Sequence, residues 1–266
     1  MRPNVGLIEP GHVYSYSQLS AVDQCPYMFY CEKIDRCEQV SNGFAEQGSL
    51  IHDLLDLWGK GMLSKDELVS EYQRRYPLEV ITAWPKMLAS KGYATKAFNL
   101  GVEYFTNFDE FKGYEVIATE QRFKTDIAGR PFVGIIDMIV KSEETGEMII
   151  LDHKSKSKKA FKDAADEMYR QQYCYAKYFI EQYGKPPDAL MFNLFKENGM
   201  KDYRKWDQQF YEDTMFWAEK QIEKIESYEF LDWLTSKDAD FFCTEICSCR
   251  KVCPNGIAKP PKKGKK

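Results

Sequence analysis

Two carboxylates and a lysine stand within neighbouring apolar segments near the middle of the chain. Asp137 lies late in FVGIIDMIV, and Asp152 and Lys154 close MIILDHK. Side chains alternate between the two faces of an extended strand, so Asp152 and Lys154 are expected on one face. Unpaired charge is costly among apolar residues, and charged groups at such a place therefore need a function. Carboxylates in this setting are what a metal site requires.

A D-x-K triplet is a weak signal by itself. Charged residues make up 29% of the chain, and the segment Glu110–Lys112 has a similar form by chance. The wider combination is more specific, because a strand with Gly-x-x-Asp is followed by the polar turn SEETGE and by an apolar strand ending in D-x-K. A simple hairpin through that turn would leave Asp137 and Asp152 at opposite ends of the strand pair, so their approach depends on the register.

With these motifs the chain resembles the RecB-like branch of the PD-(D/E)xK nuclease superfamily, which includes CRISPR-associated exonucleases and many phage recombination nucleases. The resemblance covers residues 15–176, and the ordered set of motifs is more specific than any single one. The matching segments are SYSQLSAVDQCPYMFY, GSLIH with His52, GIIDMI with Asp137, LDHKS with Asp152 and Lys154, and QQYCYA with Gln171 and Tyr175.

The resemblance implies a Mg²⁺ or Mn²⁺ site. Asp137 and Asp152 would supply oxygen ligands, His52 a nitrogen ligand that favours manganese, and His153 its backbone carbonyl. The metal would polarise the scissile phosphate and lower the pKa of the attacking water. Lys154 would hold that water or stabilise charge on the phosphate.

Three further residues allow two interpretations each. Gln171 and Tyr175 lie one helical turn apart, and the resemblance implies that they position the DNA strand or Lys154. They could equally be surface or packing residues. Glu120, in a strand with apolar neighbours, is either close to the metal or part of an ordinary cross-strand pair with an arginine or lysine.

The eight cysteines are informative by position, because four of them cluster near the C-terminus. Some RecB-like nucleases hold a [4Fe–4S] cluster with one cysteine from the N-terminal helix and three from the C-terminal end, and Cys25 occupies the first place. The usual C-x2-C-x5-C spacing is replaced by C-x3-C-x-C-x3-C, with one cysteine too many. A self-contained Zn²⁺ site or an absence of metal are the alternatives. The C-terminal cysteines are Cys243, Cys247, Cys249 and Cys253.

Helices, three strands, a helix, a fourth strand and a last helix are expected in this order. Ser17 and Ser64 are read as helix caps, and a helix after residue 84 is expected to run towards residue 108. The pattern predicts an α/β fold, a small mixed sheet flanked by helices with a helical N-terminal part and a C-terminal cysteine segment. One nuclease domain, residues 1–253, would comprise a helical part (12–112), a catalytic sheet core (113–200) and a long helix with the cysteine segment (201–253).

Composition restricts the cellular setting. A hydrophobic content of 44% suffices for a core, and no apolar run approaches the roughly 20 residues of a membrane span. The N-terminus lacks the apolar centre of a secretory signal. We therefore expect a soluble protein in the cytoplasm of a bacterial or phage-infected cell, without membrane contact. The net charge is −4, but residues 254–266 carry five lysines, which predicts a basic disordered tail.

Two functions from different classes follow from the resemblance. The first is a metal-dependent exonuclease acting on single-stranded DNA ends in recombination, repair or phage DNA metabolism. The second is a catalytically silent nucleic-acid-binding or scaffold subunit of a larger nuclease or CRISPR adaptation complex. No G-x-x-x-x-G-K-[ST] loop is present, so an ATP-driven step would need a helicase or recombination partner.

Overall fold

The structure is a computed structural model that describes residues 7–236 and 238–257. The chain divides into two compact units, each assembled from separate segments. Unit 1 comprises Met1–Asn42, Asp126–Val133 and Met215–Lys266, and unit 2 comprises Gly43–Thr125 and Gly134–Thr214.

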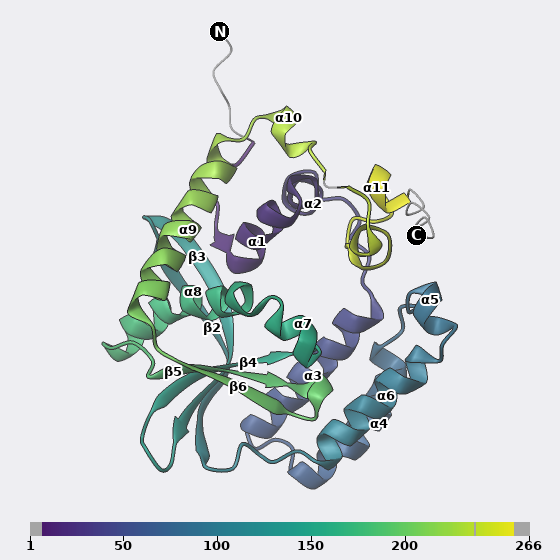
Figure 1. The fold of residues 1–266 in the computed structure, drawn as a ribbon, viewed down its shortest axis with the longest axis vertical. Coiled ribbons are helices and arrows are strands. Elements are labelled where there is room, and N and C mark those ends of the chain that lie inside the picture. Colours follow the sequence, from purple (N-terminus) through teal and green to yellow (C-terminus); the bar gives the residue numbers. More distant parts are fainter. Residues whose placement is uncertain (1–6, 237, 258–266) are drawn as a thin grey trace. The chain divides into compact units, whose positions relative to one another are not determined.

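Unit 2 contains most of a mixed sheet (Figure 1). β3 pairs antiparallel with β4, β4 parallel with β5, and β5 antiparallel with β6, while β2 pairs with β3. The parallel pair is possible because the chain between β4 and β5 forms helices and returns to the same end of the sheet. The strands are β2 (Tyr114–Ile127), β3 (Arg130–Ser142), β4 (Met148–Lys154), β5 (Ala189–Leu194) and β6 (Met200–Lys205).

The helices of unit 2 supply an apolar core beside the sheet. Leu50, Leu54 and Tyr72 are fully buried together with Val140 and Leu151 of the strands. Ser64 caps its helix as expected, since it forms a capping box with Glu67. In Figure 1, α3, α4 and α6 lie together. The helices are α3 (Gly43–Gly59), α4 (Lys65–Glu79), α5 (Lys86–Ala89), α6 (Tyr93–Thr106), α7 (Lys158–Lys162) and α8 (Ala165–Tyr183).

The register of β3 against β4 corrects the expectation that Asp137 and Asp152 lie at opposite ends of the strand pair. Met138 is the partner of Leu151, and Lys141 is the partner of Met148. The same register, continued by one residue, sets Asp137 directly opposite Asp152. The expectation was wrong because β3 continues to Ser142, so that Asp137 stands within the strand.

Unit 1 brings the N-terminal helix and the C-terminal segments together. Phe29 stacks on Trp233 with ring centroids 4.9 Å apart, and the Trp217 indole donates to Asp23. The first helix begins at Tyr16 with Ser15 at its N-cap position, so the expected cap at Ser17 was wrong. Unit 1 contains β1 (Tyr14–Ser15), which pairs with the start of β3, α1 (Tyr16–Gln24), α2 (Pro26–Phe29), η1 (Tyr30–Ile34), α10 (Phe230–Trp233), η3 (Phe242–Ile246) and α11 (Pro254–Ile257).

Several expected elements differ in extent. The helix expected between residues 84 and 108 is divided into α5 and α6 by Ser90–Gly92, where Gly92 has a positive φ of 67°. The last long helix, expected from about residue 207 to residue 234, ends at Ser227 as α9 (Gln208–Ser227) and is followed by the short α10. Most of the expected basic tail lies outside the described residues. Within the described part of the chain, none of the helices has the length and apolar character needed to cross a membrane.

Candidate functional site

Three potential metal ligands from three elements converge in unit 2. They are His52 on α3, Glu120 on β2 and Asp137 on β3, and their ligand atoms all lie within 4.8 Å of one another. Glu120 has a φ of 43°, a left-handed conformation that an acidic residue rarely adopts inside a strand. Backbone strain of this kind is often found at functional sites, where surrounding structure holds it in place.

Asp152 and Asp137 lie next to each other on paired strands. Oδ2 of Asp137 accepts a hydrogen bond from the backbone N–H of His153 at 2.8 Å and lies 3.3 Å from Nδ1 of His52. Asp152 is only 4% exposed, and its Oδ2 has no hydrogen-bond partner, although the Lys154 ammonium faces it at 2.8 Å. A buried carboxylate oxygen without such a partner is costly unless a cation faces it.

The pKa values of this group reflect crowded, buried carboxylates. Burial, reinforced by the charge of Asp152, raises the pKa of Asp137. Burial also raises the pKa of Glu120, with a further contribution from Asp137. Burial lowers the pKa of His52, which favours the neutral imidazole that a metal ligand needs. A bound divalent cation would remove the repulsion between the carboxylates, so the donor set fits Mg²⁺ or Mn²⁺.

Lys154 is held beside the carboxylates by a short chain of side chains. Its ammonium lies 2.8 Å from Oδ2 of Asp152, an ion pair without hydrogen-bond geometry, and donates to Oε1 of Gln171 at 2.9 Å. Nε2 of Gln171 in turn donates to the Tyr175 hydroxyl at 2.9 Å. Burial by itself lowers the pKa of Lys154, but the attraction of Asp152 and Asp137 outweighs it, so that the pKa is raised. The ammonium is therefore charged at neutral pH.

The His153 side chain is buried and hydrogen-bonded to Asn193. The Asn193 amide donates to Nδ1 of His153 at 2.9 Å and to the Tyr104 hydroxyl at 2.8 Å. Burial lowers the pKa of His153 far below its usual value, and the ring is neutral. The hydrogen bond from Asn193 engages Nδ1 of His153, and the backbone carbonyl of His153 stays the candidate ligand that the family resemblance implied.

The structure brings together every predicted metal and catalytic residue of unit 2. Gln171 is hydrogen-bonded to Lys154, and Tyr175 is hydrogen-bonded to Gln171. These contacts favour the interpretation that the two residues position Lys154 over the interpretation that they are surface residues. Glu120 joins the group of residues that could hold a metal ion, whereas the sequence left its role open. Asn193 was missed, because an amide within the apolar run DALMFNLFK gives no signal of its partners.

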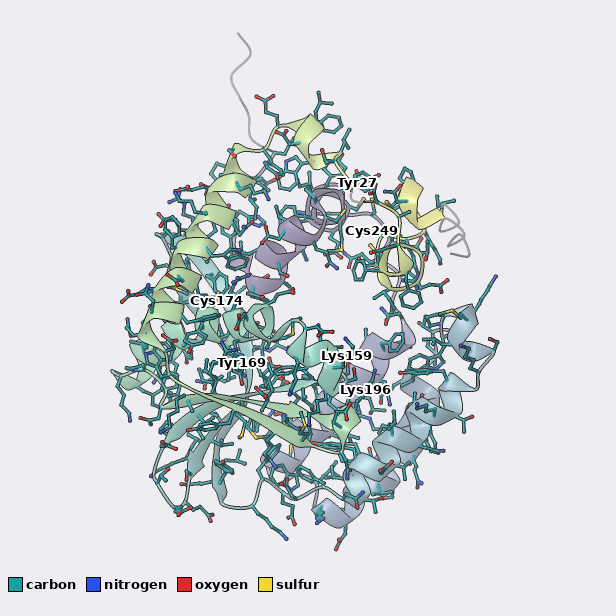
Figure 2. All side chains as sticks on the ribbon, viewed as in Figure 1. Tyr27, Lys159, Tyr169, Cys174, Lys196 and Cys249 are labelled. Atoms are coloured by element: carbon teal, nitrogen blue, oxygen red, sulfur yellow. The ribbon has the colours of Figure 1, made fainter. Side chains whose placement is uncertain are left out.

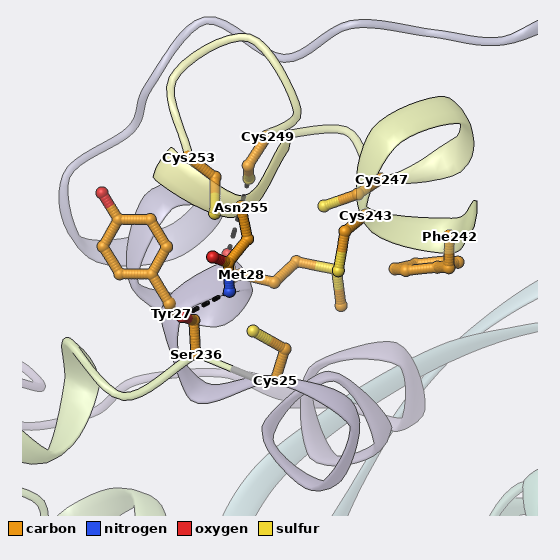
Figure 3. Close-up of a pocket in the computed structure, with 10 residues that line it drawn as sticks. All are labelled: Cys25, Tyr27, Met28, Ser236, Phe242, Cys243, Cys247, Cys249, Cys253 and Asn255. Carbon is orange, nitrogen blue, oxygen red and sulfur yellow. Dashed lines mark hydrogen bonds between the residues drawn. The ribbon is translucent and has the colours of Figure 1, made fainter. Parts of the chain in front are cut away.

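The cysteine site lies within unit 1. Cys25, Cys243, Cys247, Cys249 and Cys253 line one pocket with Met28 and Phe242, and Figure 3 shows the side chains of Cys25, Cys247 and Cys253 directed into it. Cys249 differs from the others. It is 1% exposed, while the other four are 7–8% exposed. Its sulfur lies 3.8 Å from the backbone oxygen of Met28, and the Cys243 sulfur lies 3.8 Å from that of Asp238.

Within the described residues, no three cysteines bring their sulfurs within 4.8 Å of one another. Four sulfurs bound to one zinc ion at about 2.3 Å would lie about 3.8 Å apart. In the described residues the cysteine sulfurs do not form such a closed tetrahedral group. The remaining cysteines are Cys31, Cys37 and Cys174, and Figure 2 shows Cys174 on α8 in unit 2.

The comparison with protein families agrees with this geometry. The family model of the PD-(D/E)XK nuclease superfamily matches residues 13–254. Among solved structures, the chain is similar to a provisionally named exonuclease from Eubacterium rectale, at 11% identity and a TM-score of 0.47, over 80% of this chain and 79% of the other. No curated protein matches the sequence.

Proposed function

Because the chain belongs to the PD-(D/E)XK nuclease superfamily, we propose that it is a Mg²⁺- or Mn²⁺-dependent exonuclease that hydrolyses single-stranded DNA from its ends. The observation that carries this proposal is the convergence of His52, Glu120 and Asp137 next to Asp152 and a charged Lys154. Carboxylates, an imidazole and an ammonium at this spacing suit phosphodiester hydrolysis.

The residues divide into two groups by role. Asp137, Asp152, Glu120, His52 and the backbone carbonyl of His153 would hold the cation. When bound, the divalent cation polarises the phosphate and lowers the pKa of the attacking water.

The second group acts on the substrate. Lys154 can direct one N–H at the scissile phosphate or the attacking water, because its ammonium has three protons and the structure assigns one hydrogen bond, to Gln171. Its positive charge would stabilise the negative charge that grows on the phosphate oxygens in the transition state. Gln171, oriented by the Tyr175 hydroxyl, fixes the direction of the Lys154 side chain. Gln171 and Tyr175 are thus positioning residues.

We further propose that the cysteine pocket holds a [4Fe–4S] cluster in preference to Zn²⁺, bound by Cys25, Cys243, Cys247 and Cys253. Among the described residues, no three cysteine sulfurs lie within 4.8 Å of one another, which supports a cluster over a single ion. Five residues separate Cys247 from Cys253, which is the family's second interval once Cys249 is left out. The burial of Cys249 supports its omission.

Nuclease assays with end-labelled DNA test the enzymatic proposal. The wild type is incubated with linear single strands, circular single strands and duplexes in Mn²⁺, Mg²⁺ and EDTA, beside Lys154→Ala. Lys141→Ala is the matched control, because Lys141 is an exposed lysine on β3. We expect metal-dependent loss of linear single strands that only Lys154→Ala abolishes. Equal cleavage of circles would refute the exonuclease assignment, and full activity of Lys154→Ala would refute the site.

Metal analysis of anaerobically purified protein tests the cluster. We expect a brown protein whose iron is lost in Cys25→Ser and Cys253→Ser and retained in Cys249→Ser. Stoichiometric zinc without iron would exclude the cluster, and loss of iron in Cys249→Ser would exclude the assignment of its ligands.

A further inference from the structure

Lys196 is a half-buried lysine in unit 2 on the turn η2 (Phe195–Glu197) that follows β5. Among the described residues, none of the carboxylates lies within ion-pair distance of its ammonium. Instead, Nζ lies 3.5 Å from the Tyr93 hydroxyl and 4.9 Å from the centre of the Phe44 ring. Burial, with no opposing acidic charge, lowers the pKa of Lys196 to about 8. An unpaired ammonium of this kind is suited to receive an anion from outside the chain.

The turn that carries Lys196 lies beside the candidate metal site. Leu194 is the register partner of Lys154, so Lys196 stands two residues beyond the end of that strand pair. The ring of Phe195 packs against the ring of His52 at 6.4 Å between centroids. A substrate strand that reaches Lys154 therefore passes close to η2.

A row of residues along α3 connects the candidate metal site with the surroundings of Lys196. Phe44, Gly48 and His52 are spaced by four residues and share one face of the helix, with Phe44 about 12 Å from His52 along the axis. A Cβ added to Gly48 would meet no atom within 4 Å, so the space between Phe44 and His52 is open. A chain with regularly spaced phosphates could follow this row from His52 to Lys196.

The surroundings are basic on one side and aromatic on the other. The segment that follows Lys154 carries Lys156, Lys158 and Lys162. Within the part of the chain that the structure describes, none of these lysines forms an ion pair with a carboxylate. The backbone N–H of Lys158 donates to Oε1 of Glu197 at 2.9 Å, which ties this segment to η2 (Figure 2 shows Lys159 and Lys196). Lys196 itself lines a surface hollow together with Glu103 and Glu197, and neither carboxylate lies within ion-pair distance of its ammonium.

We propose that Lys196 and Tyr93 together bind a backbone phosphate of the DNA strand, close to the phosphate that is cleaved at the metal site. Both groups donate hydrogen bonds, and at 3.5 Å apart they can reach the same phosphate oxygen. The Phe44 ring supports the ammonium from one side through a cation–π contact. The inference rests on the proposed nuclease function, and it adds a positioning subsite for the substrate.

The test compares DNA binding and cleavage in matched variants. A fluorescein-labelled single strand is titrated in EDTA at several salt concentrations with the wild type, Lys196→Met, Lys196→Arg, Tyr93→Phe and the control Lys141→Met. Cleavage by the same proteins is measured in Mn²⁺, and thermal melting shows whether each variant is folded. Lys196→Met retains the apolar stem, so its folding is expected to be intact.

We expect Lys196→Met to weaken binding by about tenfold, the loss of one charge-assisted hydrogen bond. The slope of log affinity against log salt should become shallower by about 0.7, as for one lost phosphate contact on a single strand. Tyr93→Phe should cost about threefold, as a neutral hydrogen bond does. Lys196→Arg should restore most of the affinity, and the loss in cleavage should fall mainly on KM.

Unchanged affinity and KM in Lys196→Met would overturn the inference while leaving the nuclease proposal intact. A weakening that Lys196→Arg does not restore, or that leaves the salt slope unchanged, would also overturn it, because a phosphate contact requires the charge. If the wild type cleaves no DNA, the nuclease proposal fails, and the binding measurements in EDTA still decide whether Lys196 contacts phosphate.

Discussion

Gln171 is expected to act on catalysis only through Lys154, and this makes its removal a stringent test of the site. In Gln171→Leu the Lys154 ammonium loses its acceptor at 2.9 Å and retains the ion pair with Asp152. The ammonium would then turn towards the carboxylates and away from the phosphate. Leucine is similar in size to glutamine, so the packing of α8 should change little.

The magnitude follows from the two hydrogen bonds in the chain. A hydrogen bond to a charged group contributes about 1.5–3 kcal/mol, so Gln171→Leu should lower kcat by about 10- to 150-fold. Tyr175→Phe removes only a neutral hydrogen bond, at 2.9 Å, and retains the packing of the ring on Phe123. We expect Tyr175→Phe to lower kcat by about two- to tenfold.

The double variant decides whether the two residues form one chain. Since Tyr175 orients Lys154 only through Gln171, the double variant should lose no more activity than Gln171→Leu alone. The assay is steady-state cleavage of a single strand in Mn²⁺, with kcat and KM separated and with Lys141→Ala as the control. The proposed positioning role would be refuted if the loss of kcat in the double variant equalled the product of the two single losses. It would also be refuted if Gln171→Leu kept the wild-type kcat.

Three other predictions concern stability, and thermal or chemical unfolding tests each of them. A Cβ at position 101 would collide with the ring and hydroxyl of the buried Tyr72, so Gly101→Ala should destabilise the fold by about 1–3 kcal/mol, whereas Gly48→Ala, in open space, should not. The pKa of Lys196 is lowered to about 8 in the folded state, so protonation opposes folding. Stability should therefore rise between pH 8 and the ordinary lysine pKa of 10.5, and Lys196→Met should lose that rise; an unchanged pH profile would contradict the environment described for Lys196. Mn²⁺ at 100 times its Kd should stabilise the wild type by about 2.7 kcal/mol, and Asp137→Asn should lose most of this gain; equal stabilisation of both proteins would place the metal elsewhere.

The sequence predicted the strands that carry the site but not the whole sheet. β2, β3 and β4 were recognisable from apolar and β-branched runs separated by short turns. β6 was missed because MKDYRK is almost entirely polar. It pairs with β5 through its backbone and needs no apolar face of its own, as is common for a strand at the edge of a sheet.

The role of Glu120 could not be derived from strand periodicity. Alternation along β2 assigns each residue to a face only while the backbone stays extended. The positive φ of 43° at Glu120 breaks this alternation and redirects its side chain towards Asp137 and His52. The pairing of Asp137 with Asp152 was similarly beyond the sequence, since a shift of one residue in register would have reversed the face of every side chain.

The order of elements along the chain explains why one lysine can serve the site. Asp152 and Lys154 stand at the end of β4, and the chain must then cross to β5, which runs parallel to it. Such a crossover is usually made by a helix packed on the sheet, and α8 supplies it here. Gln171 and Tyr175 are four residues apart, hence on one face of α8, and that face meets Lys154. The connection that makes the parallel pair possible thus also provides the residues that orient the Lys154 ammonium, so shifting α8 by a single residue should impair catalysis even with every metal ligand in place.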